Sequence, residues 1–166
     1  MAAKDSSFDV VSQVDMMEVD NAYQQTLKEL SQRYDLKDSN ATIELSKPQK
    51  TVTVVAPSEF VASQVVDVFT TRLVRRKVDL ASVKWADPAM ASGGNVRIVG
   101  SIVEGIEQEL AKKISKDIRD AKFKAKVTVE GDKLKVSSPS KDVLQEVIAF
   151  LRNKDYGQPL QYVNYR

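Results

Sequence analysis

A pattern of strand, proline, serine and helix occurs twice in this chain, over residues 52–69 and again over residues 134–151. In each copy, alternating apolar residues lead into a Pro-Ser step, after which apolar residues recur at helical spacing. The proline stops the strand from continuing, and the serine hydroxyl can accept a hydrogen bond from a first-turn amide. Chance recurrence is the alternative explanation. Because the apolar positions agree at one fixed offset along a whole helix, we interpret the pattern as two similar tandem units.

The segments around the two copies extend the same order of elements. Each half of the chain reads β-α-β-β-α-β, the order of ferredoxin-like and RNA-recognition folds. We therefore expect an α+β protein with a first ferredoxin-like unit at 7–86, a linker at 87–94 and a second unit at 95–166. The linker is assigned because its residues are small and rich in helix and strand breakers. The expected strands begin near residues 8, 42, 51, 82, 96, 125, 133 and 160, and the expected helices near 15, 58, 106 and 140.

Composition excludes several classes of chemistry. The 166 residues include no cysteine and no histidine, which removes disulfides, thiolate nucleophiles, imidazole acid-base catalysis and Cys/His zinc sites. We expect no cofactor and no metal site. Apolar runs are too short to span a bilayer, which needs about 20 residues, and the N-terminus has no signal-peptide core. The sequence thus predicts a cytoplasmic protein without a membrane partner.

Positive charge is concentrated in the second half, where residues 95–166 contain 14 Lys/Arg against 10 Asp/Glu. The densest part is a predicted helix after Gly105. On this helix, Lys112, Lys116 and Arg119 fall within about 60° of one another, opposite an isoleucine stripe. Such a row could be an ordinary solvated helix face, or it could bind phosphates in a salt-dependent way.

A second basic group, which includes Arg72 and Arg76, ends the first repeated helix. Cations there complement the negative end of the helix dipole, which is a sufficient structural reason for them. RNA-recognition modules stack bases on aromatic residues of their central strands. Here the first strand offers Phe8 as a stacking candidate, but both third strands lack aromatic residues, which argues against ordinary binding of RNA on the sheet. The C-terminal segment 157–166 fits an edge strand better than a binding tail.

Nearly the whole chain resembles the YajQ family of bacterial proteins. The resemblance lies in the motifs at 7–15, 19–22, 33–35, 105–109, 111–114, 144–145 and 158–166. It implies two tandem ferredoxin-like domains that exchange their C-terminal strands, so that each fourth strand completes the sheet of the other unit. It also implies a non-enzymatic, nucleotide-binding role, because family members are linked to cyclic di-GMP, GTP and tRNA and to transcriptional regulation.

Three functional hypotheses remain open. The first is a regulatory protein that binds a nucleotide, such as cyclic di-GMP or GTP, or binds RNA such as tRNA. The second is a protein-interaction adaptor whose basic helix contacts an acidic partner. The third is a magnesium-dependent enzyme acting on nucleotides, although no catalytic spacing is visible. For the first hypothesis, the candidate phosphate ligands are Lys112, Lys116 and Arg119, or Arg33, Arg72 and Arg76.

Overall fold

The computed structural model describes residues 5–166. Within these residues, the α-helices are α1 (Met16–Gln32), α2 (Glu59–Arg75), α3 (Gln108–Asp120) and α4 (Lys141–Arg152). The strands are β1 (Ser6–Val11), β2 (Thr42–Ser46), β3 (Thr51–Ala56), β4 (Val83–Trp85), β5 (Ala89–Met90), β6 (Val96–Ile102), β7 (Lys126–Glu130), β8 (Lys133–Ser138) and β9 (Gln161–Val163). No helix in this part of the chain is both long enough and apolar enough to cross a membrane.

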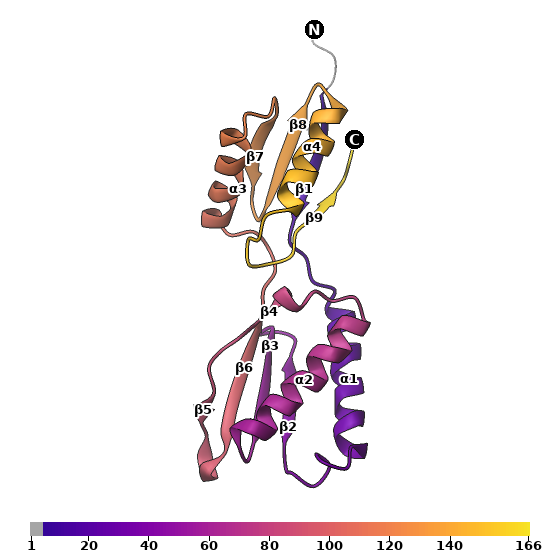
Figure 1. Ribbon diagram of the computed structural model, residues 1–166, viewed down its shortest axis with the longest axis vertical. Coiled ribbons are helices and arrows are strands. Elements are labelled where there is room, and N and C mark those ends of the chain that lie inside the picture. Colours follow the sequence, from indigo (N-terminus) through magenta and orange to yellow (C-terminus); the bar gives the residue numbers. More distant parts are fainter. Residues whose placement is uncertain (1–4) are drawn as a thin grey trace. The chain divides into compact units, whose positions relative to one another are not determined.

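Residues 14–103 form one compact unit, which we call the middle unit. Its antiparallel sheet has the strand order β2-β3-β6-β4, and the short β5 also pairs with β6. Helices α1 and α2 pack against each other and against this sheet (Figure 1). The partly buried ring of Trp85 packs against the core of this unit and meets Phe69 edge-on, with the centroids 6.2 Å apart. Gly100 leaves room for this indole, because a Cβ there would lie 2.8 Å from two of its ring atoms.

The second unit combines an N-terminal and a C-terminal segment of the described chain, and we call it the terminal unit. It contains the segment up to Gln13 together with residues 104–166. Its sheet has the order β7-β8-β1-β9, and the contacts between these neighbours are antiparallel. Residues of α3 and α4 share one core with the inward side chains of β1 and β8, so both helices cover the same face of the sheet (Figure 1). Within residues 5–13 and 104–166, no helix lies on the opposite face (Figure 1).

The expected exchange of C-terminal strands is wrong. The fourth strands stay with their own halves, because β4 is in the sheet of β2 and β3, and β9 is in the sheet of β7 and β8. The exchanged strands are the first ones. β1 lies between β8 and β9, while β6 lies between β3 and β4. A repeat in the sequence predicts the order of the elements, but it contains no information about which equivalent strand fills a central position in a sheet.

The observed division also differs from the expected boundaries. The chain passes between the units after residue 13 and again after residue 103, whereas the sequence suggested a single linker at 87–94. Those linker residues lie inside the middle unit, where β5 pairs with the first residues of β6. A strand of only two residues has no sequence pattern that would separate it from a loop.

The repeated Pro-Ser step does form matching helix starts. The Ser58 hydroxyl accepts a hydrogen bond from the Val61 amide at 3.2 Å, and the Ser140 hydroxyl accepts one from the Val143 amide at 3.4 Å. Each serine is thus the N-cap of its helix, α2 or α4. The two units therefore agree in local structure at the repeat, and a common origin by duplication remains our prediction.

Candidate functional site

The open face of the terminal sheet is polar because of strand alternation. Along β1, Phe8 and Val10 enter the core, so Ser7 and Asp9 lie on the other face. The same alternation in β8 buries Leu134 and Val136 and leaves Lys133 and Lys135 on the open face. Asp9 lies opposite Lys135 in the β1–β8 register, so a carboxylate and an ammonium group are cross-strand neighbours.

Asp9 is the most constrained residue of this face. It is only 8% exposed, and its Oδ2 accepts hydrogen bonds from Asn164 Nδ2 at 2.7 Å and from Lys133 Nζ at 3.4 Å. Burial by itself would raise the pKa of Asp9. The hydrogen bonds from Asn164 and Lys133, together with the charges of Lys133 and Lys135, outweigh burial, so the pKa of Asp9 lies below its ordinary value. Asp9 is therefore a buried carboxylate that stays ionised.

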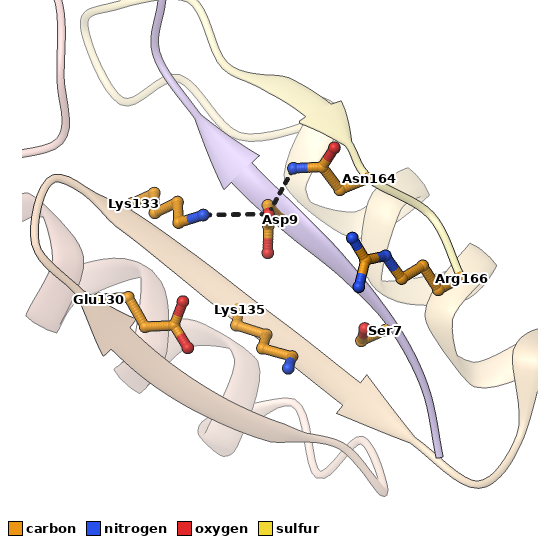
Figure 2. Close-up of a pocket in the computed structure, with 7 residues that line it drawn as sticks. All are labelled: Ser7, Asp9, Glu130, Lys133, Lys135, Asn164 and Arg166. Atoms are coloured by element: carbon orange, nitrogen blue, oxygen red, sulfur yellow. Dashed lines mark hydrogen bonds and ion pairs between the residues drawn. The ribbon is translucent and has the colours of Figure 1, made fainter. Parts of the chain in front are cut away.

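The C-terminal segment supplies two more residues of the face. After β9, Asn164 adopts a left-handed backbone conformation with φ of 56°, which asparagine tolerates better than most residues. Two residues later, the backbone of Arg166 pairs with that of Ser7 through two hydrogen bonds, of 3.1 and 2.8 Å. These contacts hold the Asn164 amide on Asp9 and place the Arg166 side chain beside β1 (Figure 2).

Together these residues line a depression that we call the polar hollow, with a volume of about 230 Å³. Figure 2 shows the side chains around it, with the helices behind the sheet. Three cationic and two anionic side chains surround the space, and none of the lining residues is aromatic or aliphatic. Such a site suits a small, charged and hydrogen-bonding group. Its lining residues are Ser7, Asp9, Glu130, Lys133, Lys135, Asn164 and Arg166.

The basic helix expected after Gly105 is α3. Lys112, Lys116 and Arg119 are exposed on it, opposite a buried face that includes Ile114 and Ile118. None of the three cations forms an ion pair with another residue between 5 and 166. The structure thus brings them together as a row of free charges on the helical side of the terminal unit, away from the polar hollow.

The arginine candidates all lie in the middle unit and are paired with acids. Glu29 binds Arg72 at 2.6 Å and Arg33 at 3.8 Å, and Arg33 also contacts Asp35 at 2.8 Å. The Arg76 guanidinium is 3.9 Å from a Glu18 carboxylate oxygen. Arg72 and Arg76 do line a common hollow of about 420 Å³. Arg33 is not among its lining residues, so the three arginines do not form one site.

Phe8 is a core residue, which corrects its choice as a stacking platform. It is completely buried, and its ring packs edge-on against Tyr162 with a centroid distance of 6.0 Å. No face of the ring is open to a base. The period-two pattern of β1 contained this information, because Phe8 and Val10 are apolar while Ser7 and Asp9 between them are polar.

Sequence reasoning missed the polar hollow. Its residues come from β1, from the β7–β8 hairpin and from the C-terminal segment, and only pairing in the folded sheet brings them together. Two local signals were present in the sequence, namely the polar alternation of Ser7 with Asp9 and that of Lys133 with Lys135. Neither identified a site, because the sheet to which β1 belongs was not known.

Comparison with known proteins identifies the family of the chain. The family model described as "Nucleotide-binding protein YajQ-like" matches residues 6–166. A protein of Acidithiobacillus ferrooxidans named "Nucleotide-binding protein" is 46% identical over 160 residues, covering 96% of this chain and 98% of the relative. A protein of the same name from Nocardia farcinica is 48% identical over 163 residues, with 98% and 99% covered. The chain therefore belongs to the YajQ-like family of nucleotide-binding proteins.

Proposed function

We propose that this chain is a non-enzymatic nucleotide-binding protein that holds ligand phosphates at the polar hollow of the terminal unit. One observation carries the proposal. Lys135 and Arg166, which form no ion pair within residues 5–166, line a solvent-open space together with Lys133, which is paired with Asp9. Within these residues, no helix of the unit covers this face of the sheet. Ammonium and guanidinium groups bind phosphate through charge-assisted hydrogen bonds. The names of the relatives, which say that they bind nucleotides, support this choice of ligand.

The α3 cations have a different part in this proposal. Lys112, Lys116 and Arg119 are exposed and free of ion pairs within the described chain, so they attract polyanions without a shaped pocket. We assign them the salt-dependent attraction of a long ligand such as RNA. The arginines Arg72 and Arg76 are a weaker choice, because a phosphate there would compete with Glu29 and Glu18.

The test is a titration of the purified protein with cyclic di-GMP, GTP and tRNA at two salt concentrations. We expect at least one ligand to bind, with lower affinity at high salt because each neutralised phosphate releases counterions. The double variant Lys135→Gln, Arg166→Gln should weaken binding about tenfold or more, since it removes two phosphate contacts. Lack of binding of all three ligands at low salt would refute the proposal.

A matched variant separates the two basic surfaces. Changing Lys112, Lys116 and Arg119 to Gln should leave the affinity for GTP nearly unchanged, but should reduce the salt slope for tRNA. If this variant alone lost GTP binding while the Lys135, Arg166 variant retained it, the ligand site would lie on α3 instead of at the polar hollow.

One observation favours a second candidate function, that of a regulatory adaptor that contacts an acidic protein. The free cations of α3 form a continuous charged row, and charge complementarity of this kind steers protein association. The adaptor hypothesis gains weight if the α3 variant binds every nucleotide normally and yet loses a protein partner that the unchanged chain captures.

A further inference from the structure

The polar hollow accommodates only part of a nucleotide. Its volume of about 230 Å³ is smaller than the roughly 300–1,000 Å³ of pockets that enclose whole small ligands. None of its lining residues is aromatic, so it offers no aromatic ring on which a base could stack. A sugar–phosphate unit matches both properties, because it is small, charged and rich in hydrogen-bonding oxygen atoms.

Asp9 has an acceptor that the protein leaves unused. An ionised carboxylate has about four acceptor sites on its two oxygens, and the donors Asn164 and Lys133 both bind Oδ2. No group within residues 5–166 donates a hydrogen bond to Oδ1. In Figure 2 this second oxygen points away from both donors, toward the hollow. Oδ1 is not a buried unsatisfied atom, so it reaches solvent in the hollow, and a donor of the ligand can take the place of water there.

The same carboxylate limits which ligands fit. Asp9 repels a phosphate placed directly on it, so the phosphate belongs on the side of Lys135 and Arg166. The group next to Asp9 must then be a donor close to that phosphate. In a ribonucleotide chain, the 2′-hydroxyl is such a donor, and deoxyribose lacks it.

We propose that Asp9 makes the polar hollow selective for ribose, by accepting a hydrogen bond from the 2′-hydroxyl of a ribonucleotide whose phosphate contacts Lys135 and Arg166. This inference rests on the proposed function, since it requires phosphate binding at the same hollow. It assigns Asp9 a role in specificity, separate from the cations that provide affinity. Recognition is independent of base sequence, because no base contact is involved.

The first test uses the unchanged protein and one short single-stranded sequence in three chemical forms, namely RNA, 2′-fluoro RNA and DNA. The fluoro analogue keeps a small substituent at the 2′ position but cannot donate a hydrogen bond. Fluorescence anisotropy should show RNA binding about tenfold more tightly than the other two, as expected for one hydrogen bond to a charged group. Equal affinity for RNA and 2′-fluoro RNA would overturn the inference.

The second test is Asp9→Asn. The two donors on Oδ2 select the orientation in which the new amide oxygen faces Asn164 and Lys133, so the amide NH2 takes the place of Oδ1. The charged acceptor becomes a neutral donor, which can pair only with the oxygen of the 2′-hydroxyl, so the preference for RNA over 2′-fluoro RNA should fall from about tenfold to about threefold or less. The control Asp87→Asn removes the same charge from an exposed position in the middle unit and should keep the full preference. Retention of that preference by Asp9→Asn would also overturn the inference.

Failure of this inference can be distinguished from failure of the proposed function. If Lys135→Gln weakens all three oligonucleotides equally while RNA has no advantage, phosphates bind at the hollow and Asp9 does not select ribose. If no oligonucleotide binds while GTP does, ribose selection in RNA is refuted and the proposed function stands. If Lys135→Gln has no effect on the binding of any oligonucleotide or of GTP, phosphate binding at the hollow is refuted and ribose selection falls with it. The comparison of RNA with 2′-fluoro RNA on the unchanged chain remains decisive even if Asp9→Asn does not fold.

Discussion

Burial and charge act against each other at Asp9. The residue is 8% exposed, yet its hydrogen bonds to Asn164 and Lys133 keep its pKa below the ordinary value. These contacts connect β1 with the C-terminal segment and with β8, so one carboxylate joins three parts of the terminal sheet. The group that we assign to ligand selection therefore also stabilises the fold.

The lowered pKa of Asp9 predicts that the terminal unit loses stability at acid pH. Because the folded pKa of Asp9 lies below the unfolded one, its stabilising contribution is complete above the ordinary pKa of 3.8 and is lost as the pH falls through the folded pKa. Asp9→Asn should lower stability at neutral pH by about 1 kcal/mol and should reduce the loss of stability on acidification. Urea unfolding at neutral pH and at about pH 3, followed through NMR signals of β1 and β8, measures both effects. An unchanged acid dependence would contradict the prediction, and Asp87→Asn is the control.

At the scale of elements, local patterns predicted most of the structure. The two Pro-Ser steps predicted the starts of α2 and α4, which the N-cap hydrogen bonds of Ser58 and Ser140 confirm. The isoleucine spacing likewise predicted α3, with Ile114 and Ile118 in the core. These signals are local, since capping and helical periodicity act within a few residues. The two-residue strand β5 was missed because it is held only by its pairing with β6.

The helix caps predict a measurable effect on the middle unit. Ser58→Ala removes the hydrogen bond to the Val61 amide and should lower the stability of this unit by about 1 kcal/mol. Ser63→Ala is a matched control, because Ser63 is exposed inside α2 and alanine has the higher helix propensity there. The fluorescence of Trp85, the only tryptophan of the chain, follows urea unfolding of this unit. Equal stability of the two variants would contradict the assigned cap.

At the scale of the whole molecule, the exchange of β1 and β6 between the two sheets determines which segments of the chain fold together. Pairs such as Phe8 with Val136 join distant parts of the chain, and nothing in the local sequence distinguishes β1 from β6 as the partner of β8. The polar hollow was missed for the same reason. Its cations and Asp9 come together only after β1 has entered the terminal sheet, so site prediction failed where topology prediction failed.

The exchange predicts which fragments of the chain can fold. A fragment of residues 14–103 contains every strand of the middle sheet, and we expect it to unfold cooperatively from a state in which Trp85 is partly buried. A fragment of residues 7–86 follows the boundaries suggested by the repeat, but it lacks β6, which pairs with both β3 and β4. Loss of this central strand leaves the amides and carbonyls of β3 unpaired along one side and removes Ile98 and Ile102 from the core.

The two fragments are compared by far-ultraviolet circular dichroism and by the emission wavelength of Trp85. The 14–103 fragment should show a single sharp thermal transition, whereas the 7–86 fragment should show water-exposed emission and no transition. A cooperatively folded 7–86 fragment would mean that β1 can replace β6 beside β3. β1 and β6 would then be interchangeable beside β3. Their observed positions would reflect two pairings of nearly equal stability and would not be fixed by the sequences of β1 and β6.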